Sequence, residues 1–124
     1  HHALHSVCLW ARDPQQIQAL QIHAENKQYL PGISLPKELL LEADFQKALG
    51  RLCSSDLLVI ATPMSGLSQI LGDVLIQAKH PLNILYLCKG LEPNTALLPH
   101  QVLQRELAKH PSHAFQHARA ESGK

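Results

Sequence analysis

Polar side chains that could bind a ligand follow three apolar runs of this chain, each where a run ends. Arg12 follows the first run, Thr62 follows another, and Lys89 with Gly90 follows a third. An ammonium group after a buried strand can approach a phosphate or a carbonyl, and the glycine lets the backbone come close to it. The alternative interpretations are an exposed turn arginine, a threonine that only starts a helix, and a strand-end lysine with its turn glycine.

Three histidines near the carboxyl end raise the question of a metal site. His113 and His117 would share one helical face, and His110 lies just before them. However, Pro111 interrupts the spacing, and no carboxylate or cysteine is adjacent. We therefore expect no metal site. The six glycines are too dispersed to form a G-x-G-x-x-G, P-loop or G-x-S-x-G motif.

The composition is that of a globular domain. A length of 124 residues suits one domain, and 45% hydrophobic with 17% charged residues argues against disorder. Eleven basic against ten acidic residues give a net charge of +1, so bulk charge predicts no nucleic-acid or anionic-membrane partner. No apolar run can span a bilayer, and no signal peptide is recognisable, which predicts a cytoplasmic protein without membrane insertion.

The three cysteines are an odd number at wide spacing, and each lies in an apolar stretch: Cys8, Cys53 and Cys88. This pattern predicts reduced thiols in a cytosolic core, not a disulfide framework or a zinc site. Cys88 lies within a predicted strand among apolar neighbours, so we expect an inert thiol rather than a nucleophile.

Apolar periodicity alternates along the chain between strand-like and helix-like segments. The predicted strands cover 7–10, 39–41, 56–61 and 83–88, and the predicted helices cover 14–27, 45–52, 63–80 and 97–110. Strands alternating with helices over short connections predict an α/β fold with a parallel sheet. The run 56–61 is continuously apolar, which is typical of a strand buried on both faces.

Residues at the predicted helix starts fit their positions. Asp13 and Asp44 can each accept hydrogen bonds from the first turn of a helix, and Pro14 suits a first helical residue. Thr62 and Pro63 are expected to serve in the same way as cap and first residue of the third helix.

Four segments in this order also resemble one known family. They are Val-Cys-Leu-Trp-Ala-Arg-Asp-Pro (7–14), Glu-Asn-Lys-Gln-Tyr-Leu-Pro-Gly (25–32), Ser-Asp-Leu-Leu-Val-Ile-Ala-Thr-Pro (55–63), and Leu-Cys-Lys-Gly-Leu-Glu (87–92) with Leu-Leu-Pro (97–99). Together they resemble the amino-terminal domain of bacterial NAD(P)-dependent glycerol-3-phosphate dehydrogenase. Each piece alone is weak, but the order and spacing over about residues 6–110 are specific.

The resemblance implies a reversible hydride transfer between NADPH or NADH and dihydroxyacetone phosphate, giving the glycerol 3-phosphate used for glycerophospholipids. It implies that Arg12 contacts the adenosine 2′-phosphate side of NADPH and that Tyr29 is a second contact near the adenosine end. It implies that Lys89 touches both cofactor and substrate. Catalytic residues and metal ligands are not expected in this chain. Without the family, Tyr29 would be interpreted as a loop aromatic that packs on its own helix.

The sequence also departs from the family pattern. The resemblance implies a Rossmann-like parallel sheet with flanking helices that lacks the first, central strand and its Gly-rich turn. Residues 1–110 then form a partial dinucleotide-binding domain, and 111–124 form a divergent tail. The helical catalytic domain is not represented, so we expect a fragment that is inactive alone. Without a central strand, 7–10 and 57–61 should pair with each other, or the chain should form a homodimer.

Two alternative functions stay open from the sequence. One is a non-catalytic α/β interaction module that packs against a partner supplying the missing strand. The other is a fragment of a different Rossmann-type dehydrogenase, against which the Asn-x-x-Tyr-Leu-Pro-Gly loop argues.

Overall fold

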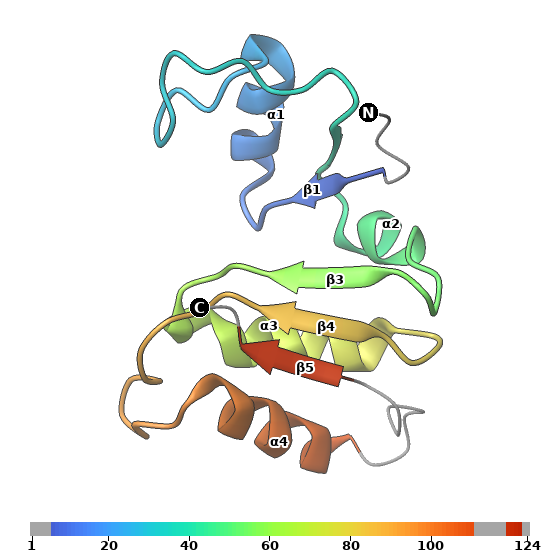
Figure 1. Ribbon diagram of the computed structural model, residues 1–124, viewed down its shortest axis with the longest axis vertical. Helices are drawn as coiled ribbons and strands as arrows, with labels where there is room; N and C mark the ends of the chain where they lie inside the picture. Colours follow the sequence, from blue (N-terminus) through green and yellow to red (C-terminus); the bar gives the residue numbers. More distant parts are fainter. Residues whose placement is uncertain (1–5, 111–118, 123–124) are drawn as a thin grey trace. The chain divides into compact units, whose positions relative to one another are not determined.

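A computed structural model describes residues 6–110 and 119–122 (Figure 1). The chain divides into two compact units, 1–51 and 52–124. Strands and helices alternate, and every strand pair is parallel. The α/β prediction is confirmed, and each predicted strand and helix is present with its ends shifted by at most four residues.

The first unit is built from two parallel strands and two helices, in the order β1 (Cys8–Trp10), α1 (Pro14–His23), β2 (Leu40–Glu42) and α2 (Phe45–Gly50). In the sheet, Cys8 lies opposite Leu40. The ring of Trp10 meets that of Phe45 edge to face at 4.9 Å, and the indole Nε1 donates to the carbonyl of Ala43. These contacts hold α2 against the end of β1.

Both predicted aspartate caps of this unit are confirmed. Asp13 accepts a hydrogen bond of 2.9 Å from the Gln15 amide, and Asp44 accepts one of 2.9 Å from the Gln46 amide. Each bond satisfies an amide in the first turn, which has no partner within its helix.

Helix α1 ends four residues earlier than its apolar spacing predicts. Ala24 adopts a left-handed conformation with φ of 50°, and its amide donates to the carbonyl of Leu20. A left-handed residue stops helical hydrogen bonding, so the loop begins here. Ile17 and Leu20 form the buried side of the helix.

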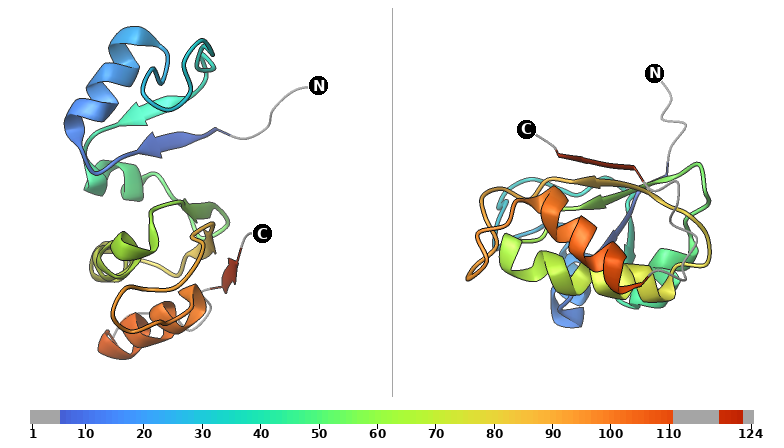
Figure 2. Two further views of the ribbon diagram at one scale, coloured as in Figure 1. Left: turned by 90° about the vertical axis from the view of Figure 1, so that its left-hand side faces the viewer. Right: turned by 90° about the horizontal axis from the view of Figure 1, so that it is seen from below.

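The second unit is a three-stranded sheet with two helices, in the order β3 (Leu57–Ile60), α3 (Met64–Gln77), β4 (Asn83–Tyr86), α4 (Pro99–Lys109) and β5 (Arg119–Ser122). The strands pair in the order β3-β4-β5. Both helices lie on one face of this sheet (Figure 2). Strand β5 was not predicted, because its sequence, Arg-Ala-Glu-Ser, has neither apolar alternation nor β-branched residues.

The core of the second unit lies between this sheet face and α3 with α4. Its fully buried side chains, at most 2% exposed, come from α3, β4 and α4: Leu67, Leu71, Val74, Leu75, Ile84, Tyr86 and Val102. In the described part of the chain, no helix is both long enough and apolar enough to cross a membrane.

Strand β3 is buried on one face only, so the prediction of burial on both faces is wrong. Ile60 is 3% exposed, whereas Leu57 is 53% and Val59 is 48% exposed. Alternate residues of a strand point to opposite faces, and both helices of this unit cover the same face.

The start of α3 also differs from its prediction. Pro63 is the cap and Met64 the first helical residue, and no side chain caps the helix. The Gly66 amide donates to the Pro63 carbonyl at 2.9 Å. The hydroxyl of Thr62 instead lies 3.9 Å from the Cys88 sulfur. Thr62 therefore faces the neighbouring strand end rather than the first turn.

The cysteine prediction holds for Cys88 but not for Cys53. All three cysteines are free, and Cys88 is 4% exposed. Cys53 is exposed because it lies in the turn before β3, where its amide donates to the Asp56 carboxylate at 2.7 Å. Cys8 is half-buried in β1.

Each unit has its own strand pairing. In the described residues, β1 pairs with β2 in the first unit and β3 pairs with β4 in the second. The expected pairing of 7–10 with 57–61 stays a prediction.

Candidate functional site

Two of the predicted polar positions lie at the same edge of the second unit's sheet. Ile60 and Tyr86 are opposite each other at the carboxyl ends of β3 and β4, and the Leu87 amide donates to the Ile60 carbonyl at 2.8 Å. These carboxyl ends of β3 and β4 lie on the left of the sheet in Figure 1. Thr62 and Lys89 follow them in the sequence. Ligands of open parallel sheets bind beyond the carboxyl ends of strands. This edge is the candidate site of the unit.

The backbone next to Lys89 is shaped by Gly90. Gly90 has φ of +86°, a conformation that residues with side chains disfavour. Apart from its two chain neighbours, no residue has an atom within 4 Å of the place a Cβ would occupy. Lys89 itself is exposed, while the preceding Cys88 is buried. The chain thus leaves the core directly before Lys89, which places an ammonium-bearing residue at the solvent-facing edge.

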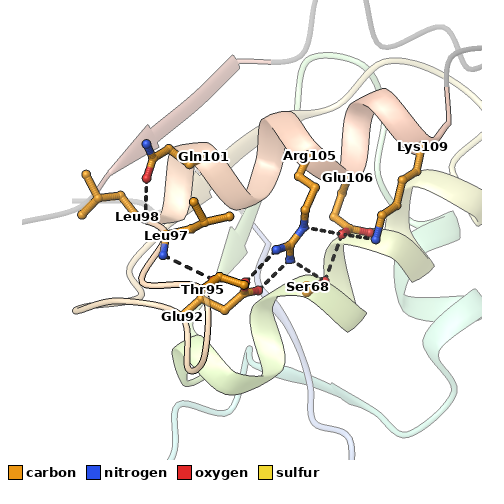
Figure 3. Close-up of polar contacts among 9 residues, drawn as sticks. All are labelled: Ser68, Glu92, Thr95, Leu97, Leu98, Gln101, Arg105, Glu106 and Lys109. Atoms are coloured by element: carbon orange, nitrogen blue, oxygen red, sulfur yellow. Dashed lines mark hydrogen bonds and ion pairs between the residues drawn. The ribbon is translucent and has the colours of Figure 1, made fainter.

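The loop that continues from Lys89 to α4 is held by an ion pair (Figure 3). Arg105 Nη1 and Nη2 each donate to the Glu92 carboxylate at 2.7 Å, one to each oxygen. The Thr95 hydroxyl donates to the same carboxylate. The Glu92 side chain is only 10% exposed. A two-pronged bond between guanidinium and carboxylate fixes direction as well as distance.

A second carboxylate lies behind this ion pair. Glu106 is 5% exposed, and its Oε2 accepts from Ser68 Oγ at 3.0 Å and Lys109 Nζ at 3.2 Å. Arg105 Nη2 donates to Ser68 Oγ at 3.1 Å, and Nε to Glu106 at 3.4 Å. We call Ser68, Glu92, Arg105, Glu106 and Lys109 the charged cluster. It joins the loop to both helices.

Hydrogen bonds in the charged cluster favour ionised carboxylates. Those from Arg105 and Thr95 lower the pKa of Glu92 from 4.5 to about 2. Burial raises the pKa of Glu106, but hydrogen bonds from Lys109, Ser68 and Arg105 outweigh burial and lower the pKa below its ordinary range. The hydrogen bond to Glu92 raises the pKa of the Arg105 guanidinium above its ordinary value.

We expect the second unit to lose stability in acid because of this cluster. The folded-state pKa of Glu92 lies below its unfolded value, so its contribution is complete above pH 4.5 and is lost as the pH falls toward 2. Glu106 acts with the same sign. The free energy of unfolding, measured by hydrogen exchange of α3 amides, should fall between pH 5 and pH 3. In Glu92→Gln this fall should be smaller, and an equal fall would contradict the assignment.

Arg12 and Tyr29 belong to the first unit. Arg12 lies in the turn between β1 and α1, and Tyr29 lies in the loop between α1 and β2. Tyr29 is 68% exposed, so the alternative in which it packs on its own helix is wrong. Its hydroxyl accepts a hydrogen bond from Gln28 Nε2 at 3.1 Å. The expected contacts of Arg12 and Tyr29 with a cofactor remain predictions.

Hydrogen bonds within the loop 25–32 explain why its sequence contains Glu25 and Asn26. The Asn26 side chain accepts from the Tyr29 amide at 3.2 Å, and the Asn26 carbonyl accepts from the Leu30 amide at 2.7 Å. The Glu25 carboxylate accepts from the Gly32 amide at 2.9 Å, where Gly32 has φ of +83°. Glu25 and Asn26 thus close the loop and present an exposed tyrosine.

The sequence does not indicate the charged cluster as a unit. Glu92 and Arg105 are 13 residues apart, and no spacing rule connects them. One signal was available, because Glu106 lies three and four residues after the buried Leu103 and Val102. A carboxylate on the apolar face of a helix requires buried partners.

The three histidines from which no metal site is expected fall partly outside the described residues. His110 follows α4, whereas His113 and His117 lie in 111–118. Within 6–110 and 119–122, no three His, Cys, Asp or Glu side chains form a group that could hold a metal ion.

Solved structures share this arrangement of elements. Glycerol-3-phosphate dehydrogenase from Coxiella burnetii is 22% identical with a TM-score of 0.72, over 82% of this chain and 30% of that one. The enzyme from Dunaliella salina is 19% identical with a TM-score of 0.69, over 94% of this chain and 20% of that one. At these identities the likeness concerns the fold.

Sequence relatives are closer. The chain is 61% identical over 112 residues to the glycerol-3-phosphate dehydrogenase (NAD(P)+) of Polynucleobacter asymbioticus, a match covering 90% of this chain and 33% of that protein. It is 39% identical over 107 residues to the Cupriavidus necator enzyme, a match covering 85% of this chain and 32% of that protein. The chain therefore spans about a third of the length of these relatives.

The family model described as the NAD-dependent glycerol-3-phosphate dehydrogenase N-terminus matches residues 1–116. This match includes all four sequence segments of the resemblance, the loop of Tyr29 and the strand end of Lys89. By this match, the chain belongs to the family of the amino-terminal domain of NAD-dependent glycerol-3-phosphate dehydrogenase.

Proposed function

We propose that this chain supplies the nucleotide-binding part of an enzyme that interconverts dihydroxyacetone phosphate and glycerol 3-phosphate with NADPH or NADH. The observation that carries the proposal is the family match over residues 1–116, with Lys89 exposed at the carboxyl edge of a parallel sheet. The product class suits glycerophospholipid synthesis. Three free cysteines support a cytoplasmic location, where thiols stay reduced.

The residues present fit a phosphate-bearing nucleotide. Lys89 offers a cation at a strand end, and Gly90 allows a ligand to approach the backbone without a side chain in the way. Arg12, after β1, offers a second cation in the first unit. NADPH or NADH, when bound, supplies the hydride of the reaction. The part of this chain is to bind and orient, because opposite charge and a fixed strand end localise a phosphate.

We assign Lys89 to both cofactor and substrate. Its ammonium group attracts the phosphate of dihydroxyacetone phosphate, and close to the carbonyl it stabilises the oxygen on which negative charge develops. A lysine suits this double role because its charge is compact and its donors rotate. Thr62, whose hydroxyl lies 3.9 Å from the Cys88 sulfur at the neighbouring strand end, is given no ligand contact in this proposal.

We further propose that β3 pairs with another strand in the complete domain. β3 stands at one end of the order β3-β4-β5, and its Leu57 and Val59 side chains are exposed. An apolar edge strand favours pairing with a further strand, either from the same protein or from a second copy. This proposal keeps the Rossmann-like sheet with a central strand as the form that binds the cofactor.

A chimaera tests the activity directly. Residues 6–110 of this chain replace the corresponding segment in the Polynucleobacter asymbioticus relative, which is 61% identical over the match. We expect NADPH-dependent reduction of dihydroxyacetone phosphate, followed by the loss of absorbance at 340 nm. A chimaera that folds, judged by circular dichroism, and yet shows no such reduction contradicts the proposed function.

Arg12→Ala in this chimaera should weaken the binding of NADPH more than the binding of NADH. If Arg12 faces the 2′-phosphate, the variant loses a charge-assisted contact worth roughly 1.5–3 kcal/mol for NADPH alone. Fluorescence titration with each cofactor measures the two dissociation constants. Arg51→Ala, at the end of α2, is the matched control and should leave both unchanged. Equal losses for both cofactors in Arg12→Ala reject the assignment.

A further inference from the structure

The segment that carries Lys89 is anchored on both sides. Before it, Cys88 is 4% exposed, and the Leu87 amide donates to the β3 carbonyl of Ile60 at 2.8 Å. After it, the Glu92 amide donates to the Leu97 carbonyl at 2.8 Å. Only Gly90 and Leu91 separate Lys89 from the Glu92 anchor. The position of Lys89 therefore depends on how firmly each anchor is held.

Gly90 makes the second anchor necessary. A glycine adopts left-handed and right-handed conformations with similar ease, so by itself it lets Lys89 move. Its φ of +86° is selected only when the chain on its far side is held in place. A loop keeps a single conformation best when the side chains that hold its ends are themselves held by packing and hydrogen bonds.

The far side is held by the Glu92 carboxylate. Both of its oxygens accept from Arg105 at 2.7 Å, and the Thr95 hydroxyl donates to it. The Ala96 amide donates to the Glu92 carbonyl at 2.9 Å, which closes the short turn 92–96. Asn94 and Ala96 both have positive φ, so this turn needs side-chain bonds to offset its backbone cost.

Arg105 is in turn fixed by groups from both helices. Ser68 of α3 accepts from Arg105 Nη2 at 3.1 Å, and the buried Glu106 of α4 accepts from Arg105 Nε at 3.4 Å. Figure 3 shows the guanidinium group between Glu92 on the loop and Ser68 with Glu106 on the helices. The Arg105 side chain thus ties the loop to both helices of the unit.

We propose that the ion pair of Glu92 and Arg105 positions Lys89 for its cofactor and substrate. The proposal rests on the proposed function of Lys89. Glu92 and Arg105 are positioning residues that act through the loop, and they need not touch either ligand. The pair holds the loop in one conformation, so that the ammonium group reaches the phosphate without a search among alternatives. Such preorganisation lowers the entropic cost of binding and of reaction.

The first test measures the loop in the full 124-residue chain. Hydrogen exchange at the amides of 89–97 should be at least about tenfold faster in Glu92→Gln than in the wild type, while α3 and β4 keep their protection. Glu42→Gln, which breaks the 3.7 Å ion pair with Arg51 in the first unit, is the matched control and should leave these amides unchanged. Unchanged loop exchange in Glu92→Gln overturns the proposal.

The second test is a double-mutant cycle in the chimaera. Glu92→Gln should lower kcat/KM for dihydroxyacetone phosphate roughly ten- to hundredfold, the loss typical of a small displacement of a reacting group. In a Lys89→Ala background it should have little further effect, because the residue through which it acts is gone. If the kcat/KM losses of the two single variants multiply in the double variant, the two residues act independently. Glu92 then has a merely structural role, and the proposal is overturned.

Two milder variants keep the test decisive if Glu92→Gln disturbs folding. Thr95→Ala removes one donor to the carboxylate and should change exchange and kinetics in the same direction by less. Arg105→Lys keeps the charge but loses the planar pair of parallel donors, so it should retain part of the activity. Loss of protection throughout α3 in both variants contradicts a positioning role.

The outcomes separate this proposal from the function on which it rests. If Lys89→Ala has the same kinetic constants as the wild type, the proposed function of Lys89 is contradicted. Impaired Lys89→Ala beside normal Glu92→Gln contradicts the positioning role alone.

Discussion

Lys89→Ala in the chimaera is expected to lower kcat/KM for dihydroxyacetone phosphate by roughly 10- to 150-fold. Loss of a hydrogen bond to a charged group costs roughly 1.5–3 kcal/mol, and each 1.4 kcal/mol is a factor of ten. The Michaelis constant should rise because the phosphate loses a cation. Turnover should fall because the developing charge on the carbonyl oxygen loses its partner.

Steady-state kinetics with varied dihydroxyacetone phosphate separate the two effects. Lys79→Ala is the matched control, because Lys79 is an exposed lysine of the same unit that lies between α3 and β4, before the strand rather than after it. It should leave both constants unchanged. Wild-type kinetics of Lys89→Ala with an unchanged circular dichroism spectrum would leave only a strand-end lysine.

Leu71→Ala should destabilise the second unit by about 2–5 kcal/mol. Leu71 is a fully buried residue of α3, so its truncation removes apolar burial and leaves a cavity. Ile76→Ala on the same helix is the matched control, since Ile76 is 58% exposed. Its cost should stay within about 0.5 kcal/mol.

Hydrogen exchange at the amides of α3 and β4 is the suitable measurement, because the chain has two compact units and a single global transition would not separate them. The free energy of opening should fall in Leu71→Ala for these amides and stay unchanged for those of α1. A cost similar to that of Ile76→Ala would mean that the core of the second unit does not depend on α3.

Much of the fold was predictable because local physical chemistry decides it. Asp13 and Asp44 cap helices through bonds to amides two residues away, which requires no distant partner. The apolar runs that became β3 and β4 form strands wherever they find a partner. Tertiary context changed the outcome where distant partners decide. Thr62 lies against Cys88 instead of capping α3, and Arg119–Ser122 forms a strand by pairing with β4.

The candidate site was predicted in part for the same reason. The strand end at Lys89 follows from one apolar run and a glycine, both visible locally. The ion pair of Glu92 and Arg105 joins residues on a loop and a helix whose approach depends on how α4 packs on α3. No spacing rule connects them, so the sequence contains both residues without indicating that they meet.

The amino-acid sequence by itself determined the α/β alternation, the two aspartate caps, the family and the position of Lys89 at a strand end. Short-range hydrogen bonds and apolar periodicity are sufficient for the alternation, the caps and the strand end, whereas the family followed from the resemblance of four segments. Only the tertiary structure decided that β3 is buried on one face, that Cys53 is exposed, and that Glu92, Arg105 and Glu106 form one cluster. These features depend on which faces pack together, and packing is set by contacts between residues that are distant in the chain.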